Sequence, residues 1–213
     1  MKWALIVVFL DSGAVWDTGF RADEFKQCEM TKAEIVEQYH ATGTGSSGIY
    51  ECVAFSSPES LIPKENLEAW SRKIGLKRAE EFYESGQLNE ALKEYIRLGG
   101  DGDAIASFRA ARMFELGEGV SGAELDKAVA WYQVAAREGH VGALKALANL
   151  FVEGRGVDRD VVQAWALLNI AVQKNDPEAL AARDALAGNM SQREREAGLR
   201  RYRKLAPKYA ATQ

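Results

Sequence analysis

The sequence predicts a small α+β segment followed by an all-α array of paired helices, an α/α solenoid. Two observations support this prediction: one pattern occurs twice, and helix-like spacing dominates from residue 67 onward. In the repeated pattern an aromatic residue precedes a Gly-x-Gly-Val loop and an alanine-containing helix, and the glycines Gly117 and Gly154 lie 37 residues apart. Self-similarity at such a period is typical of solenoids, in which each helix pair buries its apolar face against the next pair.

The bulk composition is that of an ordinary globular protein. The 213 residues are 47% hydrophobic and 27% charged, with a net charge of −4. This balance favours no nucleic-acid partner and is too mild for disorder. No run approaches the roughly 20 apolar residues of a membrane span, so none is expected. Residues 193–213 nevertheless carry seven basic and two acidic side chains. These cations fit a solvated helix end, or contact with an acidic partner or with the acidic residues 1–66.

Residues 1–56 are expected to form a small α/β domain, and residues 57–66, which contain two prolines, a linker. Strand-like runs over 3–10, 14–20 and 49–55, with a helix over 22–39, predict a β-β-α-β layer whose helix covers one face of the sheet. The first apolar run also resembles an export signal with a cleavage site at Ser12-Gly13-Ala14. It is short, however, and Asp11 follows it directly, which favours the strand.

The two cysteines, Cys28 and Cys52, fall on the helix and the third strand of this predicted domain. If those two surfaces meet, the sulfurs can form a disulfide; otherwise they are buried thiols that behave as small hydrophobes. A single pair does not fix the redox compartment. A cytoplasmic location is slightly favoured, and a periplasmic or exported one stays open.

The segment from Gly43 to Gly48 matches the G-x-G-x-x-G fingerprint of dinucleotide-binding loops. That mechanism requires a strand before the glycines and a helix N-terminus after them, so that backbone amides meet the pyrophosphate. Here the expected order is helix, loop, strand. The segment is therefore interpreted as a flexible turn, and no cofactor is expected.

Eight helices, paired into four hairpins, are expected across residues 67–213, and the last pair caps the array. Capping patterns mark helix starts at Ser121 (with Glu124), Asp160, Asp176 and Ser191. Gly139 suits the left-handed residue that ends a helix. The expected helices span residues 67–85, 88–98, 104–116, 124–137, 141–152, 161–174, 178–186 and 192–205.

The repeated residues resemble the Sel-one-like repeat, a relative of the tetratricopeptide repeat. The unit of that family has a small residue and an aromatic on its first helix, a Gly-x-Gly-Val loop, an Asp-x-x-x-Ala helix start, a Trp-Tyr pair and an Ala-Ala-x-x-Gly end. The second hairpin carries Ala111, Phe114, Gly117, Gly119, Val120, Ala128, Trp131, Tyr132, Ala135, Ala136 and Gly139. The third carries Ala148, Phe151, Gly154, Gly156, Val157, Asp160, Ala164 and Ala171, and departs at Leu167, Leu168 and Asn175.

The resemblance covers about residues 70–190 and implies a tetratricopeptide-like helical array of bacterial type that binds other proteins. In this register the alanines let helix axes approach closely. Trp131 and Tyr132 are expected to be buried between repeats.

No pattern for catalysis or metal binding stands out. His40 and His140 lie 100 residues apart, and neither belongs to an H-x-x-x-H or H-x-E pattern. Nucleophile-elbow, phosphate-loop and S-x-x-K patterns are also missing from the sequence. No catalytic residue and no metal ligand is therefore assigned, and His140, which lies between two repeats, is interpreted as a helix cap.

The sequence thus favours a non-enzymatic scaffold or adaptor that binds a protein or peptide partner on the concave face made by the first helices of the repeats. Aromatic and arginine side chains often carry binding energy, and plain exposure is the alternative for each candidate. The candidates for this face are Phe108, Arg112, Glu115, Lys145 and Asn149. Two other functions stay open: a structural self-assembly module, since the oligomeric state is unknown, and a hydrolase-type enzyme with a site between the two domains.

Overall fold

The computed structural model describes residues 2–9, 15–22, 48–55 and 64–209, with burial and side-chain contacts for residues 72–209. The chain divides into two compact units, Met1–Ile74 and Gly75–Gln213. Each unit is described by itself.

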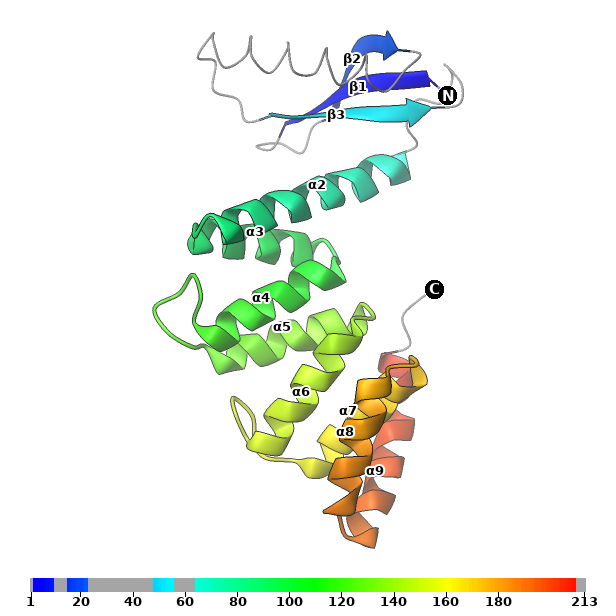
Figure 1. Cartoon of the computed structure of the whole chain (residues 1–213). Helices are drawn as coiled ribbons and strands as arrows, with labels where there is room; N and C mark the ends of the chain where they lie inside the picture. Colours follow the sequence, from blue (N-terminus) through cyan, green and yellow to red (C-terminus); the bar gives the residue numbers. More distant parts are fainter. Residues whose placement is uncertain (1, 10–14, 23–47, 56–63, 210–213) are drawn as a thin grey trace. The chain divides into compact units, whose positions relative to one another are not determined.

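The first unit contains three strands in one antiparallel sheet (Figure 1): β1 (Lys2–Phe9), β2 (Val15–Ala22) and β3 (Gly48–Phe55). The order is β2-β1-β3, so β1 pairs with both neighbours. Residues 23–47, with Cys28 and nearly all of the predicted helix, lie outside the described residues. The β-β-α-β layer and the Cys28–Cys52 bridge therefore stay predictions.

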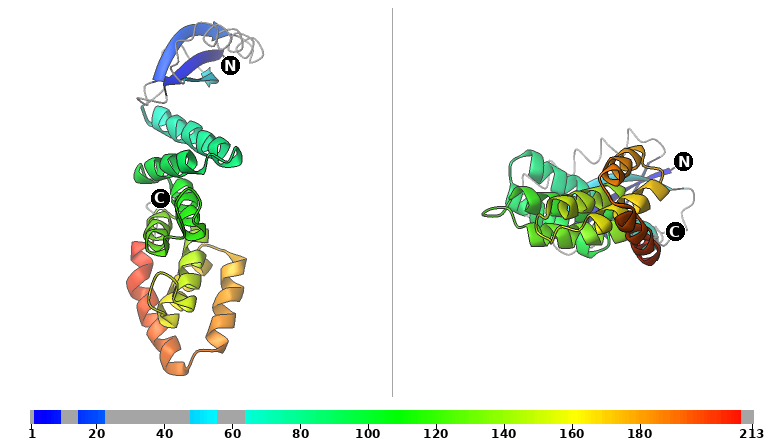
Figure 2. Two further views of the ribbon diagram at one scale, coloured as in Figure 1. Left: turned by 90° about the vertical axis from the view of Figure 1, so that its left-hand side faces the viewer. Right: turned by 90° about the horizontal axis from the view of Figure 1, so that it is seen from below.

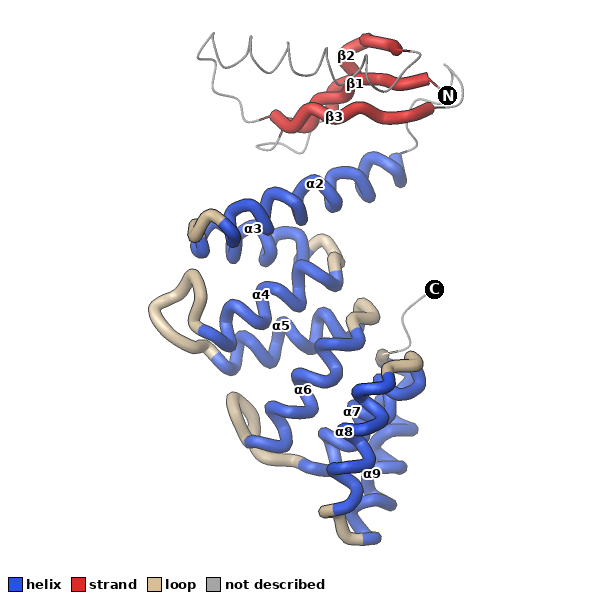
Figure 3. The backbone as a smooth tube through the Cα atoms, in the orientation of Figure 1, coloured by secondary structure: helices blue, strands red, loops and turns tan. Residues whose placement is uncertain are grey.

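Helices make up most of the chain from residue 64 onward, and short loops join them (Figure 3). The first helix, α2, begins three residues before the predicted start, because it includes Lys64-Glu65-Asn66, which precede its first apolar residue. The other helix ends differ from prediction by at most two residues. The helices are α2 (Lys64–Glu84), α3 (Leu88–Gly100), α4 (Ala104–Leu116), α5 (Leu125–Arg137), α6 (Val141–Glu153), α7 (Val161–Gln173), α8 (Pro177–Gly188) and α9 (Gln192–Leu205), followed by a short 3₁₀ helix, η1 (Ala206–Lys208).

Within the second unit, each helix from α3 to α7 packs on the next along the chain, and α9 packs on α7 (Figures 1 and 2). The all-α helical array predicted from the repeated pattern is therefore confirmed. None of the helices among the described residues is long and apolar enough to cross a membrane.

The junctions between helix pairs repeat the same local chemistry. Each has a residue with positive φ, which ends one helix: Gly102 at +85°, Gly139 at +94° and Asn175 at +62°. The next residue caps the following helix, because its side chain accepts a hydrogen bond from the backbone N–H three residues on: Asp103, His140 and Asp176, at 2.8, 3.2 and 2.8 Å. Asparagine tolerates the left-handed region better than other non-glycine residues. The departure of the third repeat at Asn175 therefore preserves the turn.

Small residues form the contact surfaces between helices, as predicted. Ala111, Ala128, Ala148 and Ala164 are fully buried, and the large side chain of Tyr132 is only 1% exposed. Trp131 is half-buried and packs against the edge of this core. The prediction that both aromatic side chains are buried is thus confirmed for Tyr132, whereas Trp131 is less buried than predicted.

Three of the four predicted capping patterns are confirmed. Ser191 and Glu194 form a complete capping box, and the carboxylates of Asp160 and Asp176 each accept a backbone N–H. The pattern at Ser121 is wrong: α5 begins only at Leu125, and Glu124 is its N-cap residue without a side-chain cap. The carboxylate of Glu124 instead pairs with Lys127 one turn on.

Candidate partner-binding face

Helix α4 presents a stripe of four exposed side chains, Ile105, Arg109, Arg112 and Leu116, which we call the α4 stripe. Their spacing of four, three and four residues places them on one side of the helix. Ile105 is 49% exposed and Leu116 56%, and both arginines are exposed. Only five large hydrophobic side chains are exposed among residues 72–209; two belong to this stripe and a third, Tyr83, lies beside it.

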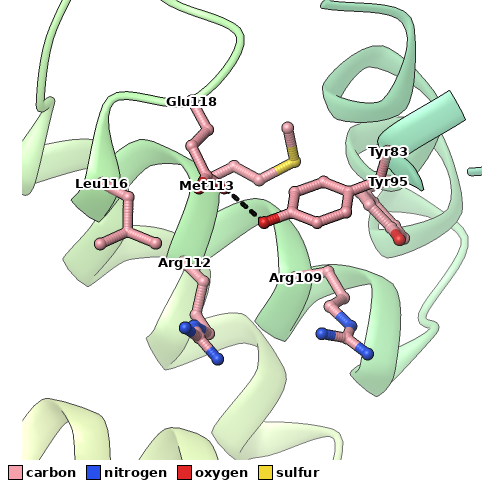
Figure 4. Close-up of a pocket in the computed structure, with 7 residues that line it drawn as sticks. All are labelled: Tyr83, Tyr95, Arg109, Arg112, Met113, Leu116 and Glu118. Atoms are coloured by element: carbon pink, nitrogen blue, oxygen red, sulfur yellow. Dashed lines mark hydrogen bonds between the residues drawn. The ribbon is translucent and has the colours of Figure 1, made fainter. Parts of the chain in front are cut away.

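A small open pocket of about 60 Å³ lies beside the α4 stripe (Figure 4). Its lining comes from α2, α3, α4 and the loop after α4: Tyr83, Tyr95, Arg109, Arg112, Met113, Leu116 and Glu118. Tyr95 and Met113 are buried. The hydroxyl of Tyr83 donates to Glu118 Oε2 at 3.0 Å. In Figure 4 the side chains of Arg109 and Arg112 extend in the same direction, away from Glu118.

Arginine charge is available at this pocket. Arg109 has one loose ion pair, with Glu80 at 3.7 Å, whereas Arg112 makes no hydrogen bond or ion pair with the residues that the structure describes. Both tyrosine hydroxyls stay protonated at neutral pH. Burial raises the pKa of Tyr95 to about 12, and the hydrogen bond to Glu118 raises the pKa of Tyr83. The pocket thus combines a free cation, hydroxyl groups and apolar surface.

The lining of this pocket consists of tyrosine, arginine, methionine, leucine and glutamate side chains. It contains no histidine, cysteine or serine, and its one carboxylate, on Glu118, is already engaged by Tyr83. Within the described residues, no group of three or more His, Cys, Asp or Glu side chains is arranged to hold a metal ion.

Phe108, one of the predicted face residues, packs between two repeats. Its half-buried ring stacks on His140 at a centroid distance of 4.1 Å and is tilted against Tyr132 at 5.7 Å. Gly142 leaves room for this stack, because a Cβ there would lie 3.0 Å from His140 Cε1 and 3.5 Å from Phe108 Cε2. A partner would reach only part of the Phe108 ring.

Glu115 and Lys145 also bond within the array. Glu115 accepts a hydrogen bond from the hydroxyl of Tyr132 at 2.7 Å and another from Arg155 at 3.2 Å. Lys145 pairs with Asp176 at 2.9 Å and with Glu178 at 2.6 Å, which ties α6 to the start of α8.

Arg112 and Asn149, the remaining two predicted residues, are exposed on α4 and α6. A partner-binding role for all five predicted residues stays a prediction. Sequence reasoning missed Ile105, Arg109 and Leu116, although their helical spacing was readable from the sequence. Tyr83 had no such signal, because its position beside α4 depends on how the first hairpin packs.

The cap formed by His140 makes stability depend on pH. Its Nδ1 accepts the N–H of Ala143, so that nitrogen must carry no proton. Burial lowers the pKa of His140, the nearby Arg109 lowers it further, and Asp103 opposes them. Because the folded pKa lies below the unfolded value of about 6.5, the unfolded chain binds more protons between the two values. The stabilisation is complete above the unfolded pKa and declines as the pH falls below it.

His140→Asn keeps a capping acceptor that cannot titrate. We expect a smaller loss of thermal midpoint for this variant than for the wild-type protein between pH about 7.5 and about 5.5. Melting curves monitored by circular dichroism at both pH values measure the difference. An identical decline in the two proteins would contradict the assignment of this titration to His140.

Successive helix pairs joined by one repeated junction define this part of the chain as an α-helical repeat protein. Residues 104–140 and 142–176 match the Sel1 repeat, so the chain contains two Sel1 repeats, and the resemblance to the Sel-one-like family is confirmed over these residues. No curated protein matches the sequence.

Two solved bacterial structures are similar. The protective antigen c5321 of uropathogenic Escherichia coli, which displays an SLR fold, has a TM-score of 0.61 at 20% identity, covering 69% of this chain and 34% of that one. A Sel1 repeat protein from Oxalobacter formigenes has a TM-score of 0.47 at 23% identity, covering 73% and 57%. The matches thus span about a third and somewhat over half of these relatives. At such identity the likeness to c5321 shows the fold alone.

Proposed function

We propose that this chain is a non-enzymatic protein-interaction module, a scaffold or adaptor, whose partner binds on the face of the first helices. Sel1 repeats generally mediate protein interactions, and two of them occupy residues 104–176. The α4 stripe and its pocket form the centre of the proposed face, and Asn149 on α6 extends it.

The observation that carries this proposal is the exposure of the α4 stripe. The aliphatic side chains of Ile105 and Leu116 are each about half exposed to solvent, and two arginines lie between them along the helix. The opposite side of this helix is buried in the core. Exposed apolar groups that gather in one place mark interaction sites more often than scattered ones. Arginine and tyrosine are also enriched among the residues that dominate binding energy.

The chemistry of the face favours a partner segment that combines carboxylate and aliphatic side chains. Arg112 is free for a bidentate hydrogen bond with a carboxylate. The neighbouring Glu115 does not neutralise it, because its carboxylate is held by Tyr132 and Arg155. Leu116 and Ile105, on the same side of α4, would be covered by an aliphatic side chain of the partner.

Affinity capture from the source organism, read by quantitative mass spectrometry, tests this proposal. The test variant is Arg112→Ala with Leu116→Ala. The matched control is Arg137→Ala with Leu180→Ala, an exposed arginine and an exposed leucine from α5 and α8. We expect at least one specific partner whose affinity falls roughly tenfold or more in the test variant and by less than about twofold in the control.

Equal retention of every specific partner by both variants would contradict the proposed face. The self-assembly alternative makes a different prediction. Light scattering would then show a mass that rises with protein concentration.

A further inference from the structure

Helix α9 carries a second exposed surface, distinct from the α4 stripe. Two of its arginines hold the helix in place. Arg195 donates to the carbonyl oxygens of Ala187 and Met190 at 3.0 and 2.5 Å, and Arg201 donates to Gln163 Oε1 at 2.7 Å. The structural role of these two arginines is therefore clear.

Five other cations remain, and none has a hydrogen bond or ion pair with any residue that the structure describes. All five are exposed, four on α9 and one in η1, and we call them the basic face: Arg193, Arg200, Arg203, Lys204 and Lys208. The two acidic residues of α9 offset these cations only in part, because two carboxylates stand against five positive charges: Glu194 accepts hydrogen bonds from Ser191 in the capping box, and Glu196 accepts one from Gln192 at 3.1 Å.

Helix stability does not account for this arrangement. The helix dipole favours cations only in the last turn, where Arg203 and Lys204 lie. Arg193 occupies the first turn, where the dipole disfavours a positive charge. Arg200 and Lys204 lie one turn apart, and like charges at that spacing are destabilising. A face that served only solubility would intersperse both signs.

The apolar side of α9 is already used. Gly198 packs on the indole of Trp165, where a Cβ would lie 2.6 Å from Cε3, and Tyr202 and Leu205 pack against the core. Leu199 is its one exposed large hydrophobic residue. Because a helix that binds at a membrane surface needs a free apolar face, a lipid ligand is disfavoured.

We propose that the basic face is a docking site for an acidic protein segment, a run rich in aspartate and glutamate. Three of the five cations are arginines, whose planar guanidinium groups pair with carboxylates in a bidentate manner. The chain then has two interaction surfaces, the α4 stripe and the basic face, that take different partner segments. This inference does not depend on the function proposed for α4.

Binding of a fluorescent poly-L-glutamate peptide of about 20 residues, measured by anisotropy at about 50 mM salt, tests the proposal. The test variant is Arg200→Glu with Arg203→Glu. The control, Lys77→Glu with Lys93→Glu, makes the same charge change at two side chains on α2 and α3 that are each 71% exposed. We expect affinity to fall roughly tenfold or more in the test variant and less than about threefold in the control, with unchanged helical circular dichroism.

Three results would overturn the proposal. The wild-type protein could fail to bind the peptide, or both variants could lose affinity equally, which would show a dependence on net charge alone. The third is tighter binding of the wild-type protein to phosphatidylserine vesicles or to a duplex of about 20 base pairs, lost in the test variant, which would assign the basic face to lipid or to nucleic acid.

Discussion

Replacing Tyr132 with alanine is expected to lower the free energy of unfolding by about 3–5 kcal/mol. Its side chain is 1% exposed and lies against the ring of Phe108. Its hydroxyl donates to Glu115 at 2.7 Å. Burial, with the adjacent carboxylate as the second cause, raises the pKa of Tyr132 far above its usual value, so the hydroxyl keeps its proton. Alanine would leave a cavity and remove a hydrogen-bond donor from Glu115.

Tyrosine-to-phenylalanine changes separate the hydroxyl from the ring. Tyr132→Phe should cost about 1–2 kcal/mol, because a partly buried carboxylate loses a donor. Tyr83→Phe is the matched control, since Tyr83 also donates to a glutamate but at the surface, and it should cost less than about 0.5 kcal/mol. Urea unfolding followed by circular dichroism measures all three variants. Equal costs for the two phenylalanine variants would contradict the burial of the Tyr132–Glu115 contact.

Gly156→Ala is expected to cost about 2–5 kcal/mol. Gly156 has a φ of +70°, which is unfavourable by about 1–2 kcal/mol for other residues. An added Cβ would also lie 2.6 Å from Leu125 Cβ and 2.8 Å from the Leu125 carbonyl oxygen. Those atoms belong to the start of α5 and cannot move aside cheaply, so overpacking adds about 1–3 kcal/mol.

Gly86→Ala measures the cost of the positive φ alone, without the steric clash that an added Cβ causes at Gly156. Gly86 has a similar φ of +78°, but a Cβ there would meet nothing within 4 Å. We expect a cost of about 1–2 kcal/mol at Gly86, measured by the same urea titration. If Gly156→Ala costs no more than Gly86→Ala, the loop after α6 does not pack on α5.

The contact of Gly156 has a counterpart one repeat earlier. A Cβ on Gly119 would lie 2.6 Å from the carbonyl oxygen of Leu88, at the start of α3. Gly119 and Gly156 are 37 residues apart, and so are Leu88 and Leu125. In both repeats, therefore, the second glycine of the loop packs on the second helix of the preceding pair. This recurrence explains why both loops have glycine at that position.

The repeated pattern made the helical array predictable. Loop glycines, buried alanines and helix caps recur at one period, so each repeat supports the interpretation of the other. Prediction failed where a short local pattern fitted more than one structure. The Ser121 pattern predicted a helix cap, but the loop extends to Glu124 before the helix begins. Leu168 replaces Tyr132 in the third repeat, where Val152 stands at the position of Glu115. The polar pair of one repeat thus corresponds to an apolar pair in the next.

The candidate face was only partly predictable. Helical spacing groups Phe108, Arg112 and Glu115 on one side of α4, but it does not show what lies across from them. Phe108 contacts His140 and Glu115 contacts Tyr132, from parts of the chain 32 and 17 residues away. Lys145 likewise meets Glu178, 33 residues on. Such contacts depend on how helices pack, so exposure could not be assigned residue by residue from the sequence.

Side-chain footprinting with a reactive carbene tests the central claim most directly, on the free protein and on its complex with the captured partner. In the free protein, Tyr83, Ile105 and Leu116 should label strongly, because they stand among the exposed large hydrophobics. In the complex these three should lose most of their labelling, while Leu180 on α8 keeps its own. Protection of Leu180 with undiminished labelling of Ile105 and Leu116 would contradict docking on the α4 stripe.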